Sequence, residues 1–195
     1  MVEKGENVHA NNDAAIKMAL KNGHMQIVRY LAEKRVNIHV FKDDAIRHAS
    51  KNGHLDMVGY LIEKCANIHI CNDDAIRQSS KNGHLDIVRM LIEKGANIHA
   101  DSDYAIRWAS KNGHSEVVQL LMEKGADINA DSDYPTEWLS EKSYIKVISY
   151  LMEHGANIHA NNDYAIRWAA TNGYHEVVEL LIKKKLISMQ IMIMQ

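Results

Sequence analysis

The sequence predicts an all-α protein, a solenoid of helix–turn–helix units, and three observations support this prediction. The stretch KNGHSEVVQLLMEKGADINA at residues 111–130 recurs with changes at 21–40, 51–70 and 81–100. Each copy follows ten residues of the form xxDxAIRxAS, so the step is 30 residues throughout, as in stacked repeats. The whole chain holds one proline and one phenylalanine, which argues against a β-rich or enzyme-like fold with many irregular loops.

The repeats are expected to form one domain over residues 1–195. Residues 1–10 align with 121–130 and form a partial repeat. Six units follow, at 11–40, 41–70, 71–100, 101–130, 131–160 and 161–190. The pattern is lost after Lys184, and residues 186–195 form an apolar C-terminal tail.

The first half of each unit predicts a short helix that begins after an aspartate. In the unit 101–130 this aspartate is Asp103, and its counterparts are Asp13, Asp43, Asp73, Asp133 and Asp163. An aspartate directly before an Ala/Ile-containing run is predicted to be an N-cap that accepts hydrogen bonds from unpaired amides. The helix is expected from about Tyr104 to Lys111. Gly113 then ends it, because glycine adopts the left-handed conformation that a helix terminus often needs.

The second half predicts a second helix over roughly Ser115–Glu123. Its apolar residues recur on one side, and its charged and amide residues recur on the other. The expected buried set is Val117, Val118, Leu120 and Leu121, and the expected exposed set is Glu116, Gln119 and Glu123. Gly125 ends this helix, and residues 126–130 form a short extended finger that leads to the next aspartate.

These motifs resemble a known family. NGHLDIVRMLIEKGANIHA at 82–100 is similar to the second half of an ankyrin repeat, and the likeness covers nearly the whole chain in register. The usual Thr-Pro-Leu-His opening is replaced by residues such as 104–107 (YAIR), and only Tyr134-Pro135 keeps the proline. The finger is about three residues shorter than in the usual 33-residue unit. This short form resembles the ankyrin arrays that giant DNA viruses of amoebae encode. The resemblance implies protein–protein recognition on the concave face, by fingers and first helices, with no chemistry of its own.

The candidate binding surface is an aromatic strip on the first helices. Tyr104, Arg107, Trp108 and Lys111 share one helical face, and stacking repeats the tyrosine and the tryptophan in later units. Trp and Tyr dominate interface energetics, so we predict a partner-binding strip. Its residues are Tyr104, Arg107, Trp108, Lys111, Tyr134, Trp138, Tyr164, Arg167 and Trp168. The alternative, that the tryptophans fill grooves between repeats, has equal weight.

In the N-terminal half the same two positions are mostly polar, and a basic column runs beside them. The tyrosine position holds Ala14, Asp44 and Asp74, and the tryptophan position holds Met18, His48 and Gln78. The column Lys17, Arg47, Arg77 and Arg107 fits an acidic partner segment or, as the weakest interpretation, a nucleic-acid backbone. The favoured alternative is structural: each arginine pairs with the aspartate four residues before it.

Two histidine columns raise the question of a metal site. His9, His39, His69, His99 and His159 form one column, and His24, His54, His84 and His114 form the other. Columns that repeat at roughly 10 Å cannot converge on one ion, so no metal site is predicted. No nucleophile, base and orienting residue recur as a set, and neither catalytic residues nor a cofactor are predicted. His114 and its equivalents are assigned to a capping position before the second helix.

Composition bounds the partners and the location. The net charge is −2, which favours neither nucleic acid nor an anionic membrane. Only Cys65 and Cys71 are present, as expected in a reducing compartment. We therefore predict an intracellular, cytoplasmic adaptor with one or more protein partners, no membrane partner and no small-molecule substrate; for a viral chain the location is the host cytoplasm. A second hypothesis is a self-associating structural element that stacks through uncapped repeat ends.

Overall fold

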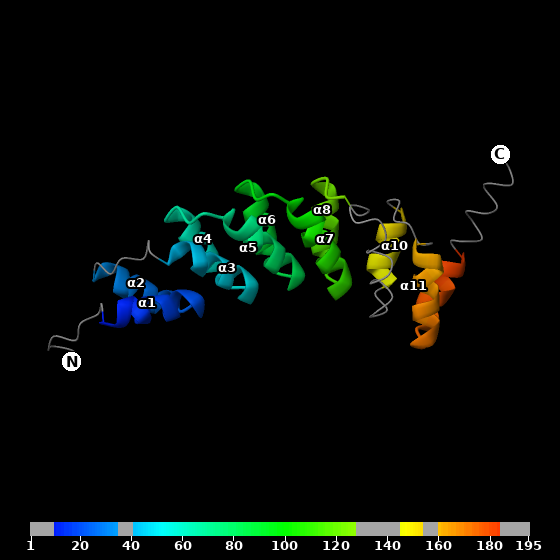
Figure 1. Cartoon of the computed structure of the whole chain (residues 1–195), viewed down its shortest axis with the longest axis horizontal. Helices are drawn as coiled ribbons and strands as arrows, with labels where there is room; N and C mark the ends of the chain where they lie inside the picture. Colours follow the sequence, from blue (N-terminus) through cyan, green and yellow to red (C-terminus); the bar gives the residue numbers. More distant parts are fainter. Residues whose placement is uncertain (1–9, 35–40, 128–144, 154–159, 184–195) are drawn as a thin grey trace. The chain divides into compact units, whose positions relative to one another are not determined.

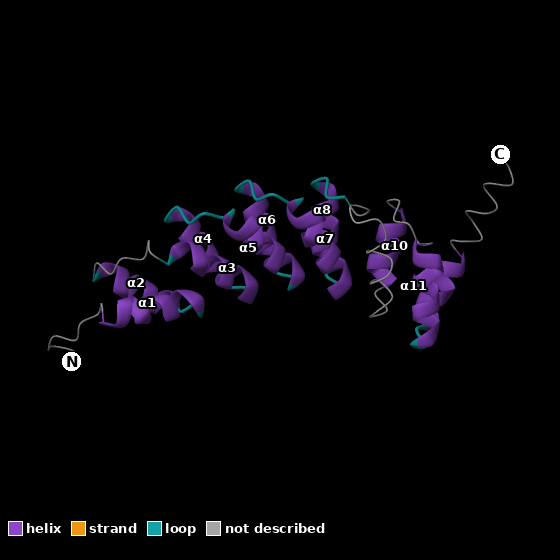
Figure 2. Ribbon diagram, viewed as in Figure 1, coloured by secondary structure: helices purple, strands orange, loops and turns teal. Residues whose placement is uncertain are grey.

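The computed structural model describes residues 10–34, 41–127, 145–153 and 160–183 of the chain (Figure 1). Every regular element within these ranges is a helix, and none of them is a strand (Figure 2). The all-α repeat fold predicted from the sequence is confirmed. The chain divides into two compact units, Met1–Asn97 and Ile98–Gln195.

The first unit contains three helix pairs, one for each repeat. The first helices are α1 (Ala10–Lys21), α3 (Lys42–Asn52) and α5 (Ile70–Lys81), and the second helices are α2 (Met25–Glu33), α4 (Leu55–Glu63) and α6 (Leu85–Glu93). α3 packs against α1, α4 and α5, and α4 also packs against α6. First helices therefore stack on first helices, and second helices on second helices.

In the second unit, α7 (Ala100–Asn112) packs against α8 (Ser115–Glu123), which also contacts α10 (Ile145–Glu153). α11 (Ala160–Thr171) follows, and a further helix spans 175–183. None of the described helices is both long enough and apolar enough to cross a membrane.

The core follows the repeat. The isoleucine in the middle of each first helix is fully buried in four successive repeats, at Ile16, Ile46, Ile76 and Ile106. The leucine in the second helix is buried at Leu31, Leu61, Leu91 and Leu121. In α8 the residues predicted to be buried are buried, and Glu116, Gln119 and Glu123 are exposed, as predicted. Gly113 ends α7 with a left-handed φ of 76°, which confirms its predicted role.

The predicted aspartate N-cap is wrong. α5 and α7 each contain a left-handed kink, at residues 71–73 and 101–103, so Asp73 and Asp103 directly precede the regular part of their helices. Among the described residues, however, the amides that donate to these two carboxylates are those of Asn97 and Asp127, and not amides of the following helix. In α3 the N-cap residue is Phe41, again without such a bond, and Asp43 already lies in the first turn of the helix.

Instead, each of these aspartates accepts a bond from a backbone amide in the next finger. Oδ1 of Asp73 accepts from the Asn97 amide at 2.8 Å and lies 2.9 Å from Nδ1 of His69. Asp43 and Asp103 accept in the same way from the amides of Asn67 and Asp127. The partner amide lies 24 residues further along the chain in all three cases, so the aspartate fastens the start of one repeat to the finger that leads to the next.

The chain reaches Asp73 and Asp103 through a left-handed turn that the sequence pattern did not predict. Cys71, Asn72 and Asp73 have φ values of 53°, 59° and 55°. Residues 101–103 repeat the same conformation. For non-glycine residues this conformation costs roughly 1–2 kcal/mol each, so it persists only where other contacts hold it. Arg77 supplies two of these contacts, since its Nη2 and Nε donate to the carbonyl oxygens of Cys71 and Asn72 at 2.9 and 3.0 Å.

Candidate partner-binding surface

On α7 the structure brings three of the predicted strip residues together. The rings of Tyr104 and Trp108 stack with centroids 5.4 Å apart and planes 29° apart. Nζ of Lys111 lies 4.8 Å from the centroid of the Trp108 ring, within the range of a cation–π contact. All three side chains are half-buried, so part of the stack faces solvent. The helical spacing of 104, 108 and 111 correctly predicted that they share a face.

Arg107, the fourth predicted residue of this helix, contacts the backbone. Its Nη2 donates to the carbonyl oxygen of Asp101 at 2.9 Å, within the left-handed turn. It thus repeats one of the bonds that Arg77 makes in α5. This contact gives Arg107 a structural role beside any role at the surface.

The remaining strip residues lie partly outside the described residues. On α11 the Arg167 guanidinium lies 6.0 Å from the centroid of the Tyr164 ring, and Arg167 is exposed. Trp168 belongs to the same helix, one residue further on. Tyr134 and Trp138 fall outside the described ranges. Their membership of the strip, and the choice between binding residue and groove filler for each tryptophan, stay predictions.

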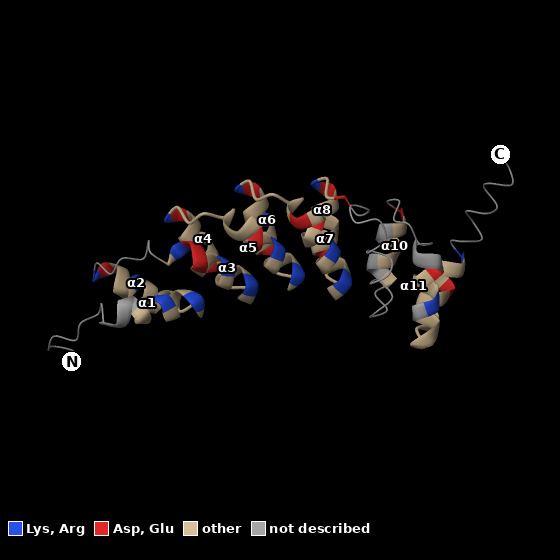
Figure 3. Cartoon of the chain, viewed as in Figure 1, with Lys and Arg blue, Asp and Glu red and all other residues tan. Residues whose placement is uncertain are grey.

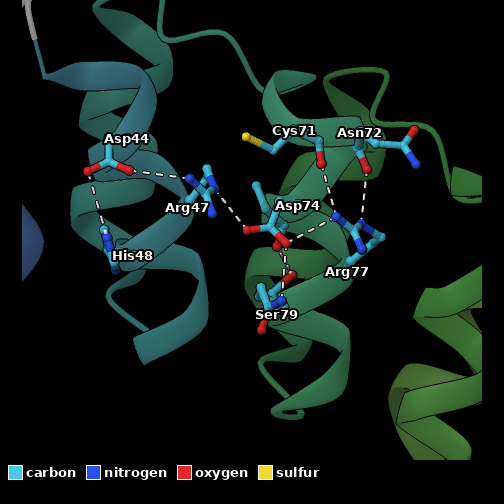
Figure 4. A network of polar contacts seen from close by, with 10 residues as sticks. Asp44, Arg47, His48, Cys71, Asn72, Asp74, Arg77 and Ser79 are labelled. Carbon is cyan, nitrogen blue, oxygen red and sulfur yellow. Dashed lines mark hydrogen bonds and ion pairs between the residues drawn. The ribbon is translucent and has the colours of Figure 1, made fainter. Parts of the chain in front are cut away.

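In the first unit the corresponding positions form an ionic network instead (Figure 4). Arg47 of α3 donates from Nε to Oδ2 of Asp74 on α5 at 2.8 Å, and from Nη1 to Oδ1 of Asp44 at 3.3 Å. Asp74 also accepts from Arg77 at 3.2 Å and from Gln78 at 3.1 Å. The network links two adjacent repeats through a carboxylate that is 7% exposed. The face is polar, as the sequence predicted, but its charged side chains pair with one another across the contact between the two repeats.

The titration of the network follows from these contacts. Burial of Asp74 opposes its ionisation, but the bonds from Arg47 and Gln78 outweigh it and lower the pKa of this carboxyl. The bond to Asp74 raises the pKa of Arg47 against the effect of burial. Burial lowers the pKa of His48, although Asp44 lies 3.7 Å away and opposes this shift. The network is therefore ionised at Arg47 and Asp74 over the whole physiological range.

The structural alternative for the basic column named the wrong aspartate as the partner of each arginine. Arg47 and Arg77 pair with the aspartates three residues before them, Asp44 and Asp74, and not with those four residues before them. The lysines one turn further on remain in the last turn of each first helix: Lys21, Lys51, Lys81 and Lys111. Each of the helices α1, α3, α5 and α7 accordingly carries a basic residue near its C-terminal end (Figure 3).

The two histidine columns make contacts that the sequence analysis missed. His69 and His99 bond to the aspartates four residues later, each with Nδ1 2.9 Å from Oδ1. The recurring spacing His-x-x-x-Asp was a visible signal for this pair. No group of three or more metal-ligating side chains occurs among the residues the structure describes.

The second column does not cap helices with its side chains. His84 stands at the N-cap of α6 without a side-chain cap bond, and its Nε2 lies 3.0 Å from the carbonyl oxygen of Lys51 in the preceding repeat. Its ring packs on Gly53, where a Cβ would lie 2.7 Å from Cε1. His54 packs on Gly23 in the same way. The Gly-His pair thus needs glycine both for its left-handed turn and for the close approach of the next histidine.

Comparison with known protein families identifies the repeat that the helix pairs and fingers form. A family model for ankyrin repeats (3 copies) matches residues 1–74 and 46–132, and one for ankyrin repeats (many copies) matches residues 137–182. The chain belongs to the ankyrin-repeat family. Ankyrin repeats generally mediate protein–protein interaction and are typically not enzymes. A search of curated proteins finds no match to this chain.

The ankyrin family confirms the resemblance drawn from the Gly-His and Glu-Lys-Gly motifs. It also gives the left-handed turn a place in the repeat. The three left-handed residues lie directly after the finger, within the bounds of α5 and α7, and the regular turns of the helix follow them. In this ankyrin array Asp, His and Arg side chains hold the finger and the left-handed turn by hydrogen bonds.

Proposed function

We propose that the protein is an adaptor that binds a protein partner through the aromatic strip on the concave face of its ankyrin repeats. The observation that carries the proposal is the Tyr104–Trp108 stack with Lys111 over the indole. Stacked aromatic rings offer a large, rigid contact area at low entropic cost, and Trp and Tyr are the residues most often found as hot spots. A lysine held over the ring adds a donor at the edge of the same patch.

Comparison between the units supports this choice of surface. In α3 and α5 the equivalent positions hold Asp44, His48, Asp74 and Gln78, and the network joins the repeats to one another. In α7 the positions of Asp74 and Gln78 hold Tyr104 and Trp108, two half-buried rings that stack on each other. Rings are not needed to hold a helix of this repeat in place, because α3 and α5 pack without them.

The class of partner follows from the resemblance and not from the geometry. The short unit resembles arrays of giant DNA viruses of amoebae, so a host or viral protein met in the cytoplasm is the partner to test first. Such a partner buries the aromatic strip and leaves the ionic network of the first unit unchanged.

The test compares three forms of the full chain as bait in affinity capture from an amoebal lysate. The forms are wild type, Trp108→Ala and Gln78→Ala, the last of which is a matched control at the same repeat position in α5. We expect a captured protein that wild type and Gln78→Ala retain, and that Trp108→Ala loses by at least about tenfold, as for a hot spot above 1.4 kcal/mol. Equal capture by all three forms refutes the strip as the binding surface.

A stability measurement separates binding from packing. If Trp108 fills a groove between repeats, its truncation lowers the free energy of unfolding by about 3 kcal/mol or more, as for a buried aromatic residue. We expect a smaller loss, because the ring is only half-buried. A large loss of stability, with capture that recovers at low temperature, assigns the tryptophan to the core.

A further inference from the structure

Few large apolar side chains are exposed in the described part of the chain, and they lie on two surfaces. Ile27 and Tyr30 of α2 are 49% and 54% exposed, and Met18 of α1, in the same repeat, is also exposed. Ile182, in the helix over 175–183, is 44% exposed. We call the surface formed by Ile27 and Tyr30 the α2 surface, and the surface around Ile182 the Ile182 surface.

Later repeats show what normally covers the α2 surface, because they carry the same residues. Ile87 stands in α6 where Ile27 stands in α2, and it is only 2% exposed. Tyr60 stands in α4 where Tyr30 stands in α2, and it is half-buried. Both tyrosines have a lysine Nζ over the ring, at 5.6 Å in α2 and 5.5 Å in α4. The residues and their local contacts match, so the difference in exposure comes from a neighbouring helix.

That neighbour is the second helix of the preceding repeat. α6 packs against α4. Gly59 of α4 faces Met90 of α6, which occupies the same repeat position as Tyr30, and a Cβ on Gly59 would lie 3.7 Å from the Met90 methyl carbon. A second helix of an ankyrin repeat is therefore the shape that fits the α2 surface.

The Ile182 surface also differs in exposure from the equivalent positions of earlier repeats. Ile62 and Ile92 hold the equivalent position in α4 and α6, and both are half-buried where Ile182 is exposed. Glu179 stands one turn earlier at the position of Gly59; it is exposed, and one of its carboxylate oxygens lies 3.8 Å from Nε2 of His175. In a joint built like α4 on α6, this carboxylate would face the Tyr30 ring and its lysine.

We propose that the two surfaces bind each other between copies of this chain, with the helix over 175–183 of one copy seated on α2 of the next. Apolar contact between Ile182 and the pair Ile27 and Tyr30 is completed by the opposite charges of Glu179 and Lys34. The two surfaces differ, so the contact is heterologous and each copy can bind two others. This association goes beyond partner binding by the aromatic strip and does not involve Trp108.

Complementation between two variants tests the proposal directly. Ile27→Glu blocks the α2 surface, and Ile182→Glu blocks the other. In light scattering with size-exclusion chromatography, we expect the mean mass of the wild-type chain to rise with concentration without a plateau at the dimer. Each variant alone stays monomeric. An equimolar mixture of the two forms a species of two chains and nothing larger, because one intact surface of each kind remains.

Controls show that the effect belongs to the joint. Gln26→Glu adds the same charge to α2 at a position where Asp56 and Asp86 are exposed in later repeats, and it should associate as wild type does. Trp108→Ala should also associate as wild type, which separates this inference from the proposed partner-binding strip. Because a glutamate at an apolar site can disturb folding, the exposed charges give a second route. Lys34→Glu and Glu179→Lys each weaken association, and the double variant restores it.

Three outcomes overturn the proposal. A wild-type chain that is monomeric up to millimolar concentration excludes a second copy as the occupant of the α2 surface. A plateau at the dimer that Ile182→Glu leaves unchanged assigns the contact to two α2 surfaces instead. A mixture of the two blocked variants that stays monomeric shows that the surfaces do not recognise each other.

Discussion

The most informative perturbation is the replacement of Asp73, whose carboxylate fastens the start of a repeat to the finger at its end. Oδ1 accepts from the Asn97 amide at 2.8 Å and contacts His69 at 2.9 Å, and the residue is 6% exposed. A hydrogen bond to a charged group contributes about 1.5–3 kcal/mol, and its loss leaves a partner unpaired. Alanine at φ 55° adds about 1 kcal/mol of left-handed strain, which aspartate tolerates better.

We therefore expect Asp73→Ala to lower the free energy of unfolding by about 3 kcal/mol, since the two bonds share one oxygen and are not additive. Asp73→Asn is the matched control, because its amide oxygen still accepts from Asn97 and asparagine also tolerates the left-handed conformation. Its cost should be about 1 kcal/mol. Urea unfolding followed by circular dichroism gives the free energies.

Hydrogen exchange locates the loss. In Asp73→Ala the Asn97 amide should exchange much faster, while its rate in Asp73→Asn stays near that of wild type. If the aspartate acted as an N-cap, exchange would instead accelerate at Ala75 and Ile76 in the first turn of α5. Acceleration there, with Asn97 unchanged, refutes the role of Asp73 in holding the finger, as does a loss of stability below about 1 kcal/mol in the alanine variant.

Three further predictions follow from the turns and the ionic network. Cys65, with φ 58°, stands where Gly95 stands in the next repeat, so Cys65→Gly should raise the free energy of unfolding by about 0.5–1 kcal/mol in the same urea titration. Gly53→Ala should cost more than Gly95→Ala, because both have a left-handed φ but only the first Cβ would meet a ring, that of His84; equal losses would contradict the close approach. Asp74→Asn should lower the free energy of unfolding at neutral pH, and the difference in this free energy from wild type should shrink as the pH falls below about 4. The reason is that a carboxyl with a lowered folded-state pKa adds stability above its unfolded pKa and loses it as the pH falls towards the folded-state pKa. A difference that is independent of pH would contradict the ion pair.

Local spacing in the sequence was sufficient to predict the helices and their buried faces. The second helix over Ser115–Glu123 has the predicted bounds, and Val118 and Leu121 are buried as the 3.6-residue period requires. The same period placed Tyr104, Trp108 and Lys111 together on α7, where they stack. These features depend on residues within one helix of one another, so a single repeat of the sequence contains all the information they need.

The partners of the polar residues depended on contacts beyond their own helix, within a repeat and between repeats. The aspartate of each unit was predicted to cap the helix that follows it, because that helix is its nearest source of free amides in the sequence. In the folded chain the left-handed turn at residues 71–73 points Asp73 at an amide 24 residues away. Arg47 likewise reaches Asp74 in the next repeat, and His84 reaches Lys51 in the preceding one.

The sequence by itself thus determined the repeat, the ankyrin family and the apolar core, because periodicity and turn glycines act over one or two turns of helix. Only the tertiary structure decided how the polar columns are used. The folding of each repeat and the stacking of repeats bring positions 24 and 33 residues apart within hydrogen-bonding distance, and a carboxylate or an imidazole bonds to the partner that lies there. The tertiary structure also shows that Ile27 and Ile87, the same residue at the same position of the repeat, are 49% and 2% exposed. The neighbouring helix, and not the residue type, decides how far each side chain is buried.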